Sequence, residues 1–217
     1  MFDYSEARGF LEGKPFPHVV LHDRWDAWTI SEAKKEYLAF TDWDGEKNMK
    51  WSVKKRFCGT AAKFPEHVAK IIQEASSDKF VSWLEGVTGI RGLMADPYLD
   101  GGGMHSIIEG GFLKVHVDFN WHEKLQAWRR LNVLLYLNPD WKEEHGGDLQ
   151  MWDINGCHKR VYPEANTMVV MTTDDRSLHG HPDPLGGGQR DSIALYYYTQ
   201  AQPIKHCAGK RIRTNYL

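Results

Sequence analysis

Residues 110–120 read GGFLKVHVDFN, and this stretch decides what the rest of the chain has to supply. Side chains two positions apart on a β-strand project to the same face, so His116 and Asp118 are expected to point the same way. A neutral imidazole beside a carboxylate suits a divalent transition metal, and a distant histidine would complete a facial triad with open coordination positions. Any strand can carry His-x-Asp by chance, so its meaning depends on the other segments.

Length and composition favour one globular domain with a substantial core. The chain has 217 residues, of which 41% are hydrophobic, and it contains nine Trp. We predict a single domain over 1–217, with 1–90 as a helix-rich support and 91–200 as the core. A formal charge of −2 gives no reason to expect nucleic acid or an anionic membrane as a partner.

The cysteines and the N-terminus indicate a cytoplasmic protein. Cys58, Cys157 and Cys207 form no CxxC pair and are odd in number, which fits a reducing compartment and argues against a disulfide framework or a structural zinc site. The first residues include acids and no apolar run, so we expect no secretory signal. The sequence has no run of 18 consecutive apolar residues, so we predict no membrane span.

Hydrophobic periodicity predicts helices in the first part of the chain and strands in the second. Before residue 90 we predict strands at 16–21 and 51–57, a turn at 42–45, and helices at 31–40 (with Ser31 as N-cap), 65–75 and 78–87. After residue 90 the predicted strands are 104–108, 112–119, 131–137, 148–152, 158–162, 167–172 and 190–199. Short strands separated by turn residues are typical of a β-sandwich or barrel.

Polar residues of the second half supply the missing parts of a metal site. Residues 177–182, SLHGHP, offer a third histidine, and a strand beginning at Arg190 follows. Period two places Arg190 and Ser192 on one face, where a guanidinium and a hydroxyl together make a receptor for a carboxylate. Tyr136 lies on another predicted strand and is a further candidate donor, although it is also compatible with a purely structural aromatic.

Five separated motifs share their order and spacing with a known superfamily. They are HVDFN, YLNPDW, the following Gly-Gly-Asp-Leu, HGHP and RDSIALYYYT. Over about residues 95–200 the chain resembles the 2-oxoglutarate- and Fe(II)-dependent oxygenases, and within them the prolyl-hydroxylase-like branch. The resemblance implies a mainly β fold with flanking helices, a double-stranded β-helix (a cupin-like jelly-roll barrel), with the metal at its more open end.

The resemblance also implies the roles of the site residues. His116, Asp118 and His179 would bind Fe(II). Arg190, helped by Ser192 and Tyr136, would bind the distal carboxylate of the cosubstrate 2-oxoglutarate, whose other end would chelate the iron. With O2, such an enzyme oxidatively decarboxylates 2-oxoglutarate to succinate and CO2 and hydroxylates an unactivated C–H bond.

Two positions refine this interpretation. His181 is an alternative to His179 as the distal ligand, but relatives often carry His-Gly-x-Pro with the first histidine as ligand, which favours His179. His181 would then lie behind the ligands or at the surface. Halogenating relatives have a small residue in place of Asp118, so the retained carboxylate predicts a hydroxylase.

The substrate is less well defined. His105, Asn120, His122 and Arg129 are our candidates for the substrate pocket, each with a structural alternative. We expect a small molecule, an amino acid or a residue of a protein as substrate. The basic tail from residue 202, with Lys205, Lys210, Arg211 and Arg213, suits a lid, a partner contact or a solvated end.

A second class of protein also fits a metal-binding barrel. A cupin-like isomerase or a non-catalytic metal-binding barrel shares the expected fold. Cupins, however, normally carry His-x-His where this chain has His116 and Asp118, and they have no need of an Arg-x-Ser carboxylate receptor. The oxygenase interpretation accounts for more of the sequence.

Overall fold

The computed structural model describes residues 4–203 and 211–217. Its helices are α1 (Tyr4–Glu12), α2 (Ala27–Ala39), α3 (Glu66–Ala75) and α4 (Asp78–Thr88), with short 3-10 turns at Ala61–Lys63 and Glu143–His145. Its first strands are β1 (His18–His22), β2 (Gly45–Met49), β3 (Ser52–Cys58), β4 (Met94–Ala95), β5 (Gly103–Val117), β6 (Trp121–His122) and β7 (Ala127–Tyr136). The others are β8 (Leu149–Asp153), β9 (Gly156–Val161), β10 (Thr167–Thr172), β11 (Leu178–His181), β12 (Gln189–Thr199) and β13 (Asn215–Tyr216).

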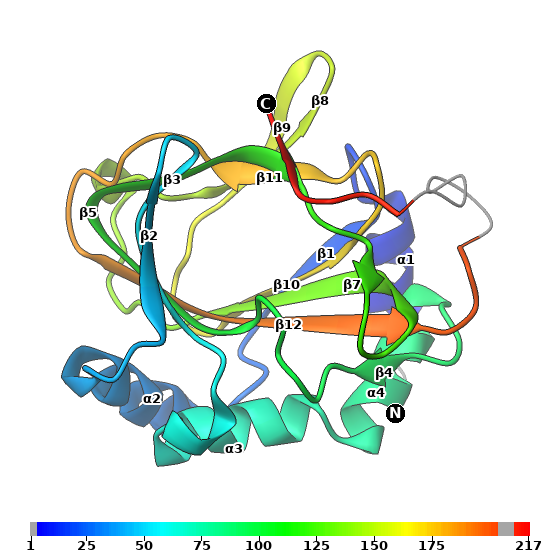
Figure 1. The fold of residues 1–217 in the computed structure, drawn as a ribbon, viewed down its shortest axis with the longest axis horizontal. Helices are drawn as coiled ribbons and strands as arrows, with labels where there is room; N and C mark the ends of the chain where they lie inside the picture. Colours follow the sequence, from blue (N-terminus) through cyan, green and yellow to red (C-terminus); the bar gives the residue numbers. More distant parts are fainter. Residues whose placement is uncertain (1–3, 204–210) are drawn as a thin grey trace.

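The strands form a nearly closed antiparallel barrel with the helices against one side (Figure 1). The hydrogen-bonded order is β1-β10-β7-β12-β5-β11-β8-β9, and β3 also pairs with β5. Helices α2, α3 and α4 cover the outer face of the layer that contains β7, β10 and β12. The predicted mainly β jelly-roll fold is therefore confirmed, and strands β1 and β3 of the N-terminal part belong to the same sheet as the core.

Strand alternation separates the helix-facing core from the barrel interior. On β12, Ile193 and Leu195 pack in the main hydrophobic core with the helices. The alternate residues Arg190 and Ser192 line the interior cavity. Strand β7 behaves in the same way, and its Tyr136 faces inward opposite Ser192. The alternation of side chains along each strand, which the sequence predicts, therefore places the polar side chains in the cavity.

One long strand connects the two layers. The sequence predicts two strands at 104–108 and 112–119, but β5 is continuous and bends between them. Its first half pairs with β12 and its second half with β11. Gly110 has a φ of 77°, and a Cβ at Gly111 would lie 2.8 Å from the carbonyl oxygen of Ile108. Glycine is therefore required where the strand changes layer.

Several predicted boundaries differ from those observed. Helix α2 begins at Ala27 and not at Ser31, because the Asp26 carboxylate accepts from the backbone N–H of Thr29 at 2.8 Å and caps the helix. Strand β2 begins at Gly45, where we predict only a turn, and pairs with β3. The sequence predicts neither helix α1 nor strand β11. Short polar strands such as β11 have little periodicity of their own, and cross-strand pairing defines them.

The structure adds three facts about other predicted features. Cys58 and Cys157 are free, and Cys207 lies outside the described residues. No helix among the described residues is both long and apolar enough to cross a membrane. Of the basic tail, Lys205 and Lys210 lie outside the described residues, whereas β13 pairs with β5 beside His116.

A buried ion pair attaches helix α2 to the cavity strand β12. Lys34 Nζ lies 2.6 Å from Asp191 Oδ2, and the Asp191 side chain is fully buried. Replacing Lys34 by Ala leaves this carboxylate without its cation, so we expect a loss of about 3 kcal/mol of unfolding free energy. Urea unfolding measures it, with Lys35→Ala as control, because Lys35 forms an exposed pair with Glu32. Equal destabilisation by the two variants would contradict the prediction.

Candidate metal centre and cosubstrate cavity

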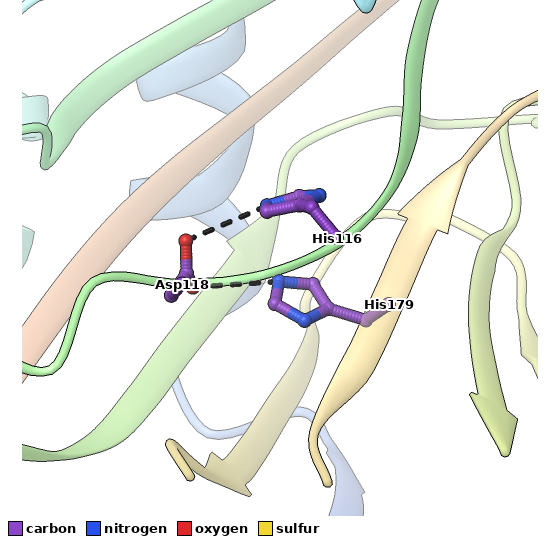
Figure 2. A group of neighbouring side chains, drawn as sticks. All are labelled: His116, Asp118 and His179. Atoms are coloured by element: carbon purple, nitrogen blue, oxygen red, sulfur yellow. Dashed lines mark ion pairs between the residues drawn. The ribbon is translucent and has the colours of Figure 1, made fainter. Parts of the chain in front are cut away.

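Three side chains from two neighbouring strands converge inside the barrel (Figure 2). His116 comes from β5, Asp118 follows the end of β5, and His179 comes from β11, where it pairs with His116 across the strands. One ligand atom from each residue lies within 4.8 Å of the others. His116 Nε2 is 3.4 Å from Asp118 Oδ1, and His179 Nε2 is 3.5 Å from Asp118 Oδ2. Two imidazoles and one carboxylate are the donor set of a non-haem Fe(II) facial triad, so these residues fit that metal.

Backbone contacts orient both imidazoles toward the centre. His116 Nδ1 lies 2.9 Å from the carbonyl oxygen of Lys114, and His179 Nδ1 lies 2.8 Å from that of Ser177. A carbonyl only accepts, so Nδ1 carries the proton and each Nε2 keeps its lone pair for a metal. Burial, and then the neighbouring His116, lower the pKa of His179 to about 4, so His179 is neutral at ordinary pH.

Asp118 is held ionised and in place by polar side chains of β7. Its Oδ2 accepts hydrogen bonds from Arg129 Nη2 at 2.9 Å and from Asn132 Nδ2 at 2.7 Å. Arg129 also donates to Asn132 Oδ1 at 2.8 Å. Although burial opposes ionisation, the Arg129 guanidinium holds the pKa of Asp118 well below its ordinary value. Asn132 was not predicted as a site residue, although its alternation with Tyr136 was the available signal.

A second group of polar side chains lines the same cavity. Arg190 is buried, its Nη2 donates to Tyr136 Oη at 3.2 Å, and its Nε donates to the carbonyl oxygen of Gly147 at 2.6 Å. Ser192 pairs with Tyr136 across β12 and β7 and lines the same cavity. Burial, opposed by Arg190, raises the pKa of Tyr136, so its hydroxyl remains a donor.

His181 also faces this cavity and is not one of the three converging ligands. It is 3% exposed, and neither ring nitrogen has a hydrogen-bond partner among the described residues. Buried polar groups are normally paired, so this histidine indicates a polar ligand in the space beside Arg190. A dicarboxylate that reaches from the metal site to Arg190 fits both observations, and 2-oxoglutarate is such a molecule.

The substrate candidates occupy different places. His105 lies on the cavity wall, whereas Arg129 is directed at Asp118. Asn120 accepts from the backbone N–H of Ile212 at 2.8 Å, and His122 lies 3.4 Å from Asp96; neither lines the cavity. A substrate role for these four residues stays a prediction.

One cavity residue, Lys55, was not predicted as part of the site. It lies in a run of basic residues, Lys54 to Arg56, inside a predicted strand. Successive side chains on a strand point to opposite faces, so in a strand with one buried face three consecutive basic residues cannot all face solvent. That run was the available signal.

A jelly-roll barrel with an interior His-Asp-His triad and a buried arginine defines a class of iron- and keto-acid-dependent oxygenases. Comparison with known proteins agrees, because residues 102–198 match the model of the family described as the 2OG-Fe(II) oxygenase superfamily. The segment that carries the triad and Arg190 is therefore similar to this superfamily, and its site fits Fe(II) as cofactor and 2-oxoglutarate as cosubstrate.

Individual relatives are similar at low identity. Prolyl 3-hydroxylase OGFOD1 of Xenopus laevis is 24% identical over 195 residues, which cover 87% of this chain and 36% of that protein. The chain thus spans about a third of the length of this relative. A prolyl hydroxylase of Trichoplax adhaerens, solved with a hypoxia inducible factor peptide, has a TM-score of 0.65 at 18% identity over 91% of this chain and 92% of its own. HygX of Streptomyces hygroscopicus, solved with nickel, 2-oxoglutarate and hygromycin B, has a TM-score of 0.59 at 12% identity over 84% of this chain and 82% of its own.

The Tyr136 hydroxyl provides a direct test of the polar group around Arg190. Tyr136→Phe removes one donor and keeps the shape of the ring. We expect the KM for 2-oxoglutarate to rise about 12- to 150-fold, the value of one hydrogen bond to a charged group, with kcat changed less than about twofold. Initial rates of succinate formation measure both constants. Tyr162→Phe, outside the cavity, is the control, and an unchanged KM in Tyr136→Phe would contradict this role.

Proposed function

We propose that this chain is a hydroxylase that couples conversion of 2-oxoglutarate and O2 into succinate and CO2 to hydroxylation of an unactivated C–H bond. The single observation that carries the proposal is the common cavity. A facial triad and a buried arginine with a tyrosine hydroxyl line the same enclosed space. That arrangement suits a keto acid held at both ends, and neither group alone would require the other.

Each residue has a role that follows from its contacts. Bound Fe(II) with 2-oxoglutarate supplies the activation of O2 and the oxidising power for the C–H bond. His116, Asp118 and His179 would hold the metal by Nε2 and carboxylate oxygens. Arg190 would pair with the distal carboxylate, with Tyr136, Ser192 and His181 as further donors. His116, His179 and Arg190 are buried, which limits the access of bulk water to the reacting groups.

For the substrate, we propose an amino-acid-type molecule or residue and a prolyl residue as the first case to test. The support comes from relatives whose names state prolyl hydroxylation. HygX, solved with hygromycin B, supports a small molecule as the other case. We also retain the prediction of a reducing, cytoplasmic location and of no nucleic-acid or membrane partner, which rests on the cysteine pattern and charge of the sequence.

The competing class remains a cupin-like isomerase or a non-catalytic metal-binding barrel. Neither requires a carboxylate receptor at Arg190. The discriminating experiment incubates the reduced, Fe(II)-loaded protein with 2-oxoglutarate and O2 and measures succinate by mass spectrometry. Metal-dependent succinate formation, even slow and without substrate, supports the oxygenase. Absence of both 2-oxoglutarate binding and turnover would overturn the proposal. A gain of one oxygen in candidate substrates then identifies the hydroxylated molecule.

A further inference from the structure

Lys55 of β3 is an unassigned cation on the wall of the metal cavity. It pairs in register with Ile107 of β5, which in turn pairs with Arg190 of β12. Residues directly opposite one another in a sheet project to the same face, so Lys55 stands in the row that includes Arg190. The bulge between Val53 and Lys55 turns this lysine inward, while Lys54 adopts a φ of 52°.

The ammonium of Lys55 has no partner among the described residues, unlike its basic neighbours. Lys54 Nζ donates to the carbonyl oxygen of Glu109 at 2.8 Å, and Arg56 Nη2 donates to Ser106 Oγ at 3.1 Å. Burial, and then nearby Lys47, lower the pKa of Lys55 to about 7. Lys55 is partly buried on the cavity wall, and a bound anion would be attracted to its ammonium there.

The charges of the loaded cavity leave this cation unbalanced. Arg129 offsets Asp118, with which it forms an ion pair. The two positive charges of Fe(II) and the two negative charges of 2-oxoglutarate offset each other. Arg190, and Lys55 when it is protonated, still contribute positive charge. A further anionic group is therefore electrostatically favoured even after metal and cosubstrate are bound.

The position of Lys55 distinguishes it from the cosubstrate receptor. Lys55 and His105 line both the metal cavity and an adjoining groove of about 430 Å³, the size of a small-ligand site. Arg190 and Tyr136 line the cavity only. Lys55 thus lies at the junction of the two spaces, through which a molecule bound in the groove would reach the metal site.

The groove has two acids of its own, and neither neutralises Lys55. Asp44 accepts from Lys63 Nζ at 2.9 Å and from the backbone N–H groups of Gly59 and Thr60. Asp100 lies on the exposed loop before β5, and no ion pair joins it to Lys55 in the described part of the chain. Neither acid of the groove therefore occupies the Lys55 ammonium, which is available to a carboxylate of a ligand.

We propose that Lys55 binds a carboxylate of the primary substrate, so that the enzyme acts on an acidic amino acid or on a residue beside an acidic side chain. This inference rests on the proposed function, because it places the substrate next to the metal. The hydroxylated carbon would face the triad while the carboxylate is held at the entrance from the groove.

The test uses two probes that differ in one charge. N-acetyl-glutamic acid amide and N-acetyl-glutamine amide are titrated by calorimetry into the Ni(II)-loaded protein saturated with 2-oxoglutarate. We expect the acidic probe to bind at least about tenfold more tightly than the neutral one, the value of an ion-paired hydrogen bond. Lys55→Met should remove this difference. Lys159→Met is the control, because Lys159 is exposed on β9.

The controls separate this inference from the proposed function. Titration of 2-oxoglutarate alone tests the cosubstrate site, and its failure to bind would count against the proposed function. If 2-oxoglutarate binds but wild type does not prefer the acidic probe, the assignment of Lys55 is wrong. The assignment is also wrong if Lys55→Met weakens 2-oxoglutarate as much as Arg190→Ala does, because the lysine would then serve the cosubstrate.

Discussion

Asp118→Ala is expected to abolish Fe(II)-dependent succinate formation and to destabilise the fold. The substitution removes the carboxylate of the triad, so turnover should fall below about one thousandth of the wild-type rate. Arg129 is 1% exposed and would lose its anionic partner. A buried charge without its partner costs about 3–5 kcal/mol, so urea unfolding should detect the destabilisation.

His179→Ala separates these two effects. It should abolish turnover to the same degree, but it deprives the fold of a single hydrogen bond, from the imidazole to the carbonyl oxygen of Ser177. We expect the unfolding free energy to fall by about 1 kcal/mol. Iron content after reconstitution, succinate formation and urea unfolding are measured together. The surface pair His158 and Asp153, 2.8 Å apart, supplies the controls His158→Ala and Asp153→Ala. Normal turnover in Asp118→Ala would show that the triad is misassigned.

Arg190→Ala should act on the cosubstrate and not on the metal. Removing a buried guanidinium that pairs with a carboxylate costs about 2–4 kcal/mol of binding free energy, or roughly 30- to 1000-fold in the KM for 2-oxoglutarate. With saturating 2-oxoglutarate, kcat should recover to within a few-fold of wild type. Calorimetric titration of 2-oxoglutarate into the Ni(II)-loaded protein gives the same change without turnover.

The control for Arg190 is an arginine with a carboxylate partner outside the barrel. Arg160→Ala removes a half-exposed side chain of β9 that pairs with Asp148 at 3.0 Å. It should leave the KM for 2-oxoglutarate unchanged. A lower kcat with an unchanged KM in Arg190→Ala would instead assign Arg190 to the reaction step.

Local pattern in the sequence was sufficient for much of this site. Period-two alternation put His116 with Asp118 and Arg190 with Ser192, because a strand offers only two faces. The order of the motifs predicted the resemblance to the superfamily whose model residues 102–198 match, and with it the fold class. Helices α3 and α4 were predicted within one residue at their ends, because an amphipathic period and caps are local signals.

The tertiary structure decided what depends on distant strands meeting. Whether His179 or His181 faces His116 follows from the register of β11 against β5, and register is a property of two segments. Arg129 was a candidate for the substrate pocket, and only folding places it against Asp118, eleven positions away. Lys55 resembled its basic neighbours in the sequence, and its inward direction comes from a bulge in a strand pairing. The sequence by itself thus predicted which side chains of the candidate site share a face, whereas charge pairing, and with it the finding that Lys55 is unpaired among the described residues, required the fold.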